Sequence, residues 1–182
     1  MVGAKGGVSR GHQSSETAVG TSPQLAYIGL GSNLESPVEQ LREALNELAT
    51  LPLSRLVATS SLYASRPVGP QDQPDFINAV AALETCLSPL ALLDQLQALE
   101  QQHRRHRHRH WGPRTLDLDL LLYANNAIDV PRLQLPHPQM TARAFVLLPL
   151  AEIAPSLNLL QQPLSAWLKR VEDQGLERLP DA

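Results

Sequence analysis

The spacing of hydrophobic positions changes several times along the chain, and each change marks an expected element. Residues 25–30 form a short apolar run that ends at Gly31-Ser32-Asn33, which predicts a strand followed by a turn. Ser36-Pro37 is typical of a helix start. The residues after it that recur at helical spacing are Leu41, Leu45 and Leu48, so we expect a helix to about Ala49.

The central segment alternates between extended and helical patterns. Residues 53–64 predict a second strand, and 66–74 an irregular loop, because three prolines prevent a regular element. Residues 76–85 predict a third strand. Ser88-Pro89 then begins a long helix whose apolar face carries Leu92, Leu93, Leu96 and Leu99.

The remaining elements complete a βαββαβ order. Residues 115–123 predict a strand, 127–135 a weaker extended segment, and 144–154 and 163–171 two short helices. This order predicts an α+β, ferredoxin-like fold, an antiparallel sheet with its helices packed on one face. We expect a single domain over 24–182. Residues 1–23 are rich in Gly, Ser and Thr and predict a flexible tail.

Composition limits the class of protein. The 182 residues, 43% of them hydrophobic, suffice for one domain. The net charge of −3 suggests neither a nucleic-acid nor a membrane partner. The single cysteine, Cys86, excludes a disulfide framework and a cysteine-cluster zinc site. No run approaches the roughly 18 apolar residues of a membrane span, and the N-terminus lacks the apolar core of a secretory signal, so we expect a cytoplasmic protein.

The positive charge is concentrated in one segment. Only two of the 15 basic residues are lysine, and five arginines lie within residues 104–114. Arginine forks match phosphate oxygens, and Gly112-Pro113 favours a mobile loop that closes over an anion. There are three alternative interpretations of this segment: a solvated loop, a contact with RNA phosphates, or a transition-metal site. The metal site would use the histidines of the segment, which are His103, His106, His108 and His110. The single aromatic Trp111 argues against a stacking platform for single strands.

Two aspartates follow the arginine-rich segment. Asp117 and Asp119 alternate with leucines, so on a strand both carboxylates share one face. Two adjacent carboxylates repel unless a cation lies between them, and Mg²⁺ takes carboxylate and phosphate oxygens together. Alone, the pair is also compatible with a solvated acidic face.

Other candidates are weaker when each is taken alone. Gln97 and Glu100 lie near the end of the second long helix, where a polar face is usually just solvated. His137 stands between two prolines, a setting that is more often structural. Phe76 and Phe145 are the only phenylalanines. They suit either core packing or the faces of a flat ligand.

Four motifs together resemble the 6-hydroxymethyl-7,8-dihydropterin pyrophosphokinase family of folate biosynthesis. They are Gly29-Leu-Gly-Ser-Asn-Leu34, Arg66-Pro-Val-Gly-Pro-Gln-Asp-Gln-Pro-Asp-Phe-Ile-Asn78, Arg114-Thr-Leu-Asp-Leu-Asp119 and Pro136-His-Pro138. The resemblance spans about residues 25–160. It implies that the pterin hydroxymethyl oxygen attacks the β-phosphorus of ATP with two Mg²⁺ ions, and that AMP is released.

The resemblance also implies residue roles. Asp117 and Asp119 would hold the metal ions, and they would be the catalytic residues together with Arg105 and Arg114. The ATP site would comprise Gln97, Glu100, Arg105, Arg107, Trp111, Arg114, Leu120, Arg132, His137 and Arg143. Phe76 and Phe145 would sandwich the pterin, and the rest of its pocket would be Ser65, Pro67, Val68, Asn78 and Trp111. We expect small-molecule substrates only and a monomer.

This sequence departs from the family pattern in the arginine-rich segment. Arg104 stands where the family usually has glycine, the segment is about one residue short, and His110 replaces a usual arginine. The register of the phosphate-contacting arginines is therefore open by one step. Two other classes of protein stay open. One is a ferredoxin-like RNA-binding module, although the predicted strands lack the paired aromatic residues on which such modules stack bases. The other is a histidine-loop metal-binding protein.

Overall fold

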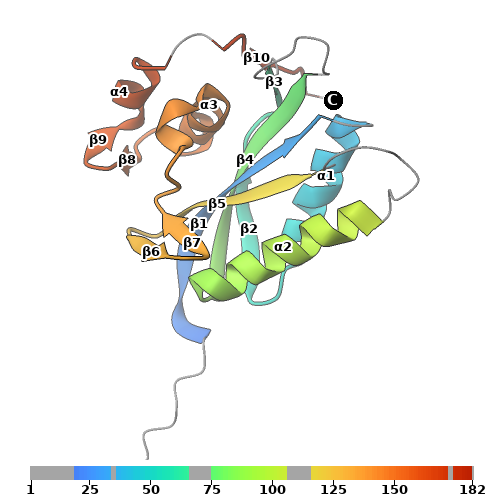
Figure 1. Cartoon of the computed structure of the whole chain (residues 1–182), viewed down its shortest axis with the longest axis vertical. Coiled ribbons are helices and arrows are strands. Elements are labelled where there is room, and N and C mark those ends of the chain that lie inside the picture. Colours follow the sequence, from blue (N-terminus) through green and yellow to red (C-terminus); the bar gives the residue numbers. More distant parts are fainter. Residues whose placement is uncertain (1–18, 34–35, 66–74, 106–115, 172–173, 182) are drawn as a thin grey trace, which may run out of the picture.

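The computed structural model describes residues 19–33, 36–65, 75–105, 116–171 and 174–181 (Figure 1). The first part of the chain forms β1 (Val19–Ser32), α1 (Pro37–Leu48), β2 (Ser54–Thr59), β3 (Tyr63–Ser65), β4 (Phe76–Leu87), α2 (Pro89–Arg105) and β5 (Asp117–Tyr123). The second part forms β6 (Ile128–Val130), β7 (Leu133–Leu135), a 3-10 turn (Met140–Ala142), α3 (Ala144–Ile153), β8 (Asn158–Leu159), β9 (Gln162–Pro163), α4 (Leu164–Leu168) and β10 (Glu177–Arg178).

The main sheet has the strand order β10-β3-β4-β1-β5, and β2 also pairs with β4. Every pair in it is antiparallel. The central strands β1 and β4 are the first and third strands of a βαββαβ motif, which is the ferredoxin-like arrangement. The fold class expected from the sequence is therefore confirmed.

Helices cover both faces of this sheet, whereas the sequence predicted helices on one face only. Alternate residues of β1 point to opposite sides. Ile28 packs in the cluster that contains Leu41 of α1 and Leu92 of α2, while Tyr27 packs in the cluster that contains Leu147 of α3. Figure 1 shows α1 and α2 on one side of the strands and α3 on the other. The split arises because α3 is itself almost wholly apolar and needs a second sheet face to cover it.

Several boundaries differ from the sequence-based expectations. β1 begins at Val19, which pairs with Leu87, so residues 19–23 belong to the strand and not to a tail. The predicted second strand is broken into β2 and β3, because the Ser60 hydroxyl accepts a hydrogen bond from the Val80 N–H (2.9 Å). The extended segment 127–135 is a hairpin of β6 and β7, with Pro131 in its turn.

β5 contains a β-bulge at Leu121. Ile28 of β1 faces Leu120, but the preceding Tyr27 faces Leu122, which leaves Leu121 as the extra residue. Leu121 and Leu122 consequently both pack on the α3 side. After the bulge, Tyr123 points to the face covered by α1 and α2. There its hydroxyl donates a hydrogen bond to the Leu87 carbonyl oxygen (2.5 Å).

A carboxylate ties the end of α3 to β3. Glu152 accepts hydrogen bonds from the Tyr63 hydroxyl (2.5 Å) and the Ser61 N–H (2.6 Å). Burial opposes ionisation of Glu152, but these hydrogen bonds outweigh it and lower its pKa. Burial, helped by the Glu152 charge, raises the pKa of Tyr63 to about 12.

Among the described residues, no helix combines the length and the apolar character that crossing a membrane requires.

Candidate active site

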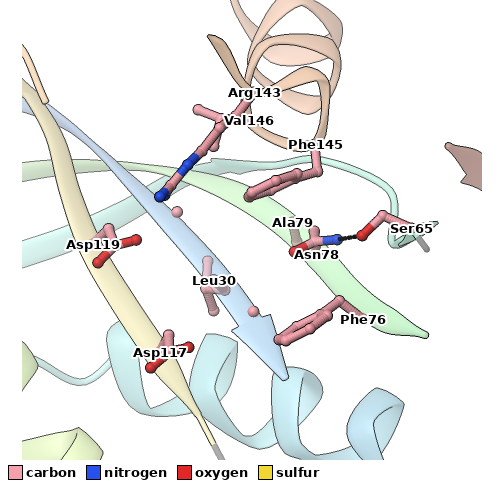
Figure 2. Close-up of a pocket in the computed structure, with 12 residues that line it drawn as sticks. Leu30, Ser65, Phe76, Asn78, Ala79, Asp117, Asp119, Arg143, Phe145 and Val146 are labelled. Carbon is pink, nitrogen blue, oxygen red and sulfur yellow. Dashed lines mark hydrogen bonds between the residues drawn. The ribbon is translucent and has the colours of Figure 1, made fainter. Parts of the chain in front are cut away.

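A cavity of about 290 Å³ lies between the sheet and α3 (Figure 2). Its lining residues come from β1, β3, β4, β5 and the start of α3: Gly29, Leu30, Gly31, Ser65, Phe76, Asn78, Ala79, Asp117, Asp119, Arg143, Phe145 and Val146. The cavity is of the size of a small flat ligand. It brings together residues from three of the four sequence motifs, namely those at 29–34, 66–78 and 114–119.

One end of the cavity has two aromatic rings and a buried amide. Phe76 and Asn78 stand at i and i+2 on β4, so they share a strand face. Figure 2 shows the rings of Phe76 and Phe145 on either side of the Asn78 side chain. The Asn78 Nδ2 donates to the Ser65 hydroxyl (2.7 Å), and both residues are only 4% exposed. This hydrogen bond fixes the plane of the amide within the cavity.

Two glycines of β1, Gly29 and Gly31, line the same cavity. A Cβ at Gly31 would lie 3.3 Å from the Asn78 Oδ1, whereas a Cβ at Gly29 would meet the Leu121 side chain at 3.5 Å. The amide therefore lies against bare backbone at Gly31. The requirement here is close approach and not an unusual backbone angle.

The aspartates of β5 lie at the opposite end. Asp117 and Asp119 line the cavity, while Leu118 and Leu120 are buried in the cluster under α1 and α2. The predicted separation of faces is therefore confirmed. Figure 2 shows both carboxylates on β5, across the cavity from the rings.

A second cavity of about 460 Å³ adjoins β5 on its other side. Its lining residues come from α2, β5 and the β6–β7 region: Leu93, Gln97, Glu100, Leu118, Asp119, Leu120, Pro131, Arg132, Leu133, Gln134, His137 and Pro138. Five of the predicted ATP-site residues are among them. Asp119 is the one described residue that lines both cavities.

Glu100 links α2 to the aspartate-bearing strand. Its Oε2 accepts a hydrogen bond from the Leu118 N–H (3.0 Å), between the two aspartates. Burial raises the pKa of Glu100, and the charges of Asp117 and Asp119 add to the effect. Three carboxyl groups thus converge here, and this is an environment that favours a bound cation.

Arg132 reaches this cavity from the β6–β7 turn. Its guanidinium donates to the Asp94 carboxylate (2.5 Å) and to the Gln97 Oε1 (3.1 Å). Arg132 and Gln97 are therefore held as a pair at the rim. Asp94 was not singled out from the sequence, because a lone acidic residue on a helix gives no signal there.

The bulge in β5 positions His137. The carbonyl oxygen of the extra residue, Leu121, accepts a hydrogen bond from the His137 N–H (2.9 Å). The His137 Nδ1 accepts from the Gln139 N–H (3.2 Å), so the neutral ring carries its proton on Nε2. Burial lowers the pKa of His137, with the Arg143 charge in the same direction and Asp119 opposing. The ring is a neutral hydrogen-bond donor at pH 7.

Arg143 lines the first cavity, although the sequence grouped it with the ATP site. It precedes α3, and its guanidinium lies 5.5 Å from the Phe145 ring centroid and donates to the Gln139 side chain. Figure 2 shows it extending from α3 toward β5. Arg143 therefore lies on the side of the aspartates that faces the two aromatic rings.

Six of the predicted site residues cannot be placed in this way. The Arg105 side chain and the whole of Arg107, Trp111, Arg114, Pro67 and Val68 lie outside the described residues, as does most of the expected mobile arginine-rich loop. The sequence motifs contained Gly29 and Gly31 without giving them a role. The signal that reveals them is their spacing of two on a strand that faces Asn78.

Comparisons with known proteins converge on one family. A family model described as 7,8-dihydro-6-hydroxymethylpterin-pyrophosphokinase (HPPK) matches residues 27–155. A 2-amino-4-hydroxy-6-hydroxymethyldihydropteridine pyrophosphokinase of Pseudomonas aeruginosa is 54% identical over 160 residues, which cover 87% of this chain and 99% of the relative. The enzyme of that name from Haemophilus influenzae is 53% identical over 155 residues, covering 85% and 97%.

Solved structures agree on the fold. A crystal structure of Plasmodium falciparum HPPK-DHPS with pterin and p-hydroxybenzoate has a TM-score of 0.64 at 15% identity. The match covers 81% of this chain and 43% of that one, so the chain spans less than half of the solved protein.

Proposed function

The chain belongs to the 7,8-dihydro-6-hydroxymethylpterin-pyrophosphokinase family, and from that premise we propose which of its residues carry the reaction. The activity is transfer of pyrophosphate from ATP to the hydroxymethyl group of 6-hydroxymethyl-7,8-dihydropterin, with release of AMP, in folate biosynthesis. The hydroxymethyl oxygen forms a bond to the β-phosphorus, and the bond from that phosphorus to the oxygen bridging it to the α-phosphorus breaks. The hydroxyl proton must be accepted as the new bond forms.

We propose that the pterin occupies the first cavity and ATP the second. The observation that carries this division is that Asp119 lines both cavities. A group transferred from one ligand to the other must cross the boundary between them, and Asp119 forms that boundary. Positioning two reactants across one residue supplies much of what a phosphoryl-type transfer needs.

The pterin would lie between the rings of Phe76 and Phe145. A flat heteroaromatic ring gains area and stacking from two aromatic faces. Asn78 would hydrogen-bond the polar edge of the pterin. Its amide plane is already fixed by the hydrogen bond from Nδ2 to the Ser65 hydroxyl (2.7 Å). This arrangement directs the hydroxymethyl group toward the aspartates.

ATP would take its place among Gln97, Glu100, Leu120, Arg132 and His137. Arg132 supplies a guanidinium at the rim, and His137 a neutral N–H donor. Both suit phosphate oxygens, because a donor that keeps its proton does not depend on pH near 7. We propose that Arg105, Arg107, Trp111, Arg114 and Arg143 contribute as well, with Pro67 and Val68 on the pterin side.

Asp117 and Asp119 fit two Mg²⁺ ions by donor chemistry, being half-buried carboxylates on one strand face with Glu100 nearby. Bound Mg²⁺ would neutralise charge on the phosphates. Asp119 would also accept the hydroxyl proton, because it borders the cavity in which the hydroxymethyl group lies. We further propose a cytoplasmic monomer, since one chain lines both cavities.

The test is AMP formation by the purified chain with ATP, the hydroxymethyl pterin and Mg²⁺. Asp119→Asn and Asp117→Asn should each lower kcat by at least about 100-fold, because each removes a negative carboxylate that would hold the Mg²⁺ ions neutralising the phosphates. Glu84→Gln is the matched control, since Glu84 pairs with Arg55 on the surface (2.8 Å) away from both cavities. Undiminished turnover in the two aspartate variants would refute the assignment.

A further inference from the structure

A polar cluster joins α1 to the C-terminal turn of α2, on the sheet side opposite the first cavity. Glu43 and Glu47 stand at i and i+4 on α1, so they share a helix face. His103 approaches from α2. One ligand atom from each residue lies within 4.8 Å of the others. None of the three residues lines either cavity described above.

The histidine is held in the manner of a metal ligand. His103 is 6% exposed, and its Nδ1 lies 2.6 Å from the Oε1 of Gln40, itself 4% exposed. An amide oxygen only accepts, so Nδ1 donates to it. Metal-ligating histidines usually donate their second N–H to an oxygen in this way, and the bond fixes the tautomer and the orientation of the ring.

The other ring nitrogen faces the carboxylates. The Nε2 of His103 lies 2.6 Å from the Glu47 Oε1, and Glu43 completes the group one turn away. The carboxylate oxygen of Glu47 only accepts, so Nε2 donates to it, and a metal ion would bind here by displacing the proton that the two groups share. A cation between them is coordinated by all three groups at once.

We propose that Glu43, Glu47 and His103 form a binding site for a divalent transition-metal ion of the Zn²⁺ class. One imidazole nitrogen and two carboxylate oxygens suit Zn²⁺ or Co²⁺ better than Mg²⁺, which prefers oxygen alone. Tetrahedral bonds of about 2.0–2.2 Å place ligand atoms roughly 3.4 Å apart, so Nε2 and the Glu47 Oε1, which lie 2.6 Å apart, would separate slightly to admit the ion. Water completes the coordination on the exposed side, where Glu43 lies.

The site would fasten α1 to the part of α2 from which the arginine-rich segment continues. Arg104 follows His103 directly, and α2 ends at Arg105. A metal ion that binds only the folded chain raises the Tm of the chain, and Tm increases with the concentration of the metal ion. The ion is therefore a structural element and takes no part in the transfer reaction.

The experiment measures Co²⁺ binding by its visible absorption, and the Zn²⁺-induced shift of Tm, with the full chain free of any affinity tag. Excess Mg²⁺ occupies the carboxylates of the active site. The background is His106→Asn/His108→Asn/His110→Asn, which leaves His103 as the one histidine of the run. We expect one Co²⁺ per chain in this background and a rise of Tm with Zn²⁺.

Adding His103→Gln to that background should abolish the band and the Tm shift. Because a buried histidine affects folding, Glu43→Gln is the second variant, and it should weaken binding at least about tenfold. Glu39→Gln, an exposed glutamate on the same helix, is the control and should bind as the background does. No stoichiometric binding in the background, or equal affinity in Glu43→Gln and Glu39→Gln, would overturn the proposal.

Discussion

Gly31→Ala should weaken pterin binding through its contact with Asn78. The added methyl carbon would lie 3.3 Å from the Asn78 Oδ1, closer than ordinary van der Waals contact. The amide cannot swing away freely, because it is 4% exposed and bound to the Ser65 hydroxyl at 2.7 Å. It must shift by a few tenths of an ångström, and either the Ser65 hydrogen bond or the bond to the ligand becomes longer.

The size of the effect follows from that hydrogen bond. A buried hydrogen bond contributes about 1 kcal/mol net, and a buried group left unpaired costs about 1–3 kcal/mol. Partial loss at one amide therefore amounts to about 1–2 kcal/mol, which raises the pterin Kd roughly 5- to 30-fold. Fold stability should change little, since alanine suits an extended strand at least as well as glycine.

The assay is calorimetric titration of the chain with the hydroxymethyl pterin in the presence of a non-hydrolysable ATP analogue. Gly29→Ala is the matched control, because it adds the same methyl group to the lining of the same cavity but meets Leu121 at an ordinary 3.5 Å. In an Asn78→Ala background, Gly31→Ala should have almost no further effect. Equal weakening by both glycine variants, or additive losses in the double variant, would refute the reasoning.

Three further outcomes are expected. Glu152→Gln should lower the free energy of unfolding near pH 7, because the ionised Glu152 carboxylate, whose pKa is lowered in the folded chain, stabilises the fold. The difference from the unmodified chain should vanish as pH falls below about 4.5, where Glu152 becomes protonated. Urea unfolding measured as a function of pH tests this. Arg132→Met should raise the KM for ATP about tenfold but leave the free energy of unfolding within ~1 kcal/mol, since its pair with Asp94 is exposed. Asp94→Asn should change that KM less, and comparable KM values in the two variants would contradict a direct role for Arg132. Removing residues 1–18 should alter kcat by less than about twofold, since β1 begins at Val19; a larger loss would give that segment a function.

Local sequence signals predicted the parts of the fold that depend on nearest neighbours. The alternation around Asp117 and Asp119 correctly placed both on one strand face. Ser36-Pro37 marked the start of α1, and Ser88-Pro89 marked that of α2. Fold class followed from the order of these elements.

Features that depend on tertiary contacts could not be predicted in this way. The break between β2 and β3 depends on Ser60 pairing with Val80, and the early start of β1 on Val19 reaching Leu87. Packing of α3 on the second sheet face follows from which strand face remains uncovered. The pairing of Arg132 with Asp94 joins two elements that are far apart in the sequence.

The bulge at Leu121 gives the site a built-in reporter. The Leu121 carbonyl oxygen accepts a hydrogen bond from the His137 N–H, so the sheet protects this one amide proton, while the His137 side chain lines the second cavity. Exchange of this proton with deuterium requires β5 and the His137 segment to separate. A nucleotide that bridges them should slow the exchange, and a pterin alone should not. Binding of the nucleotide is thereby readable from a single backbone position, without any label on the substrate.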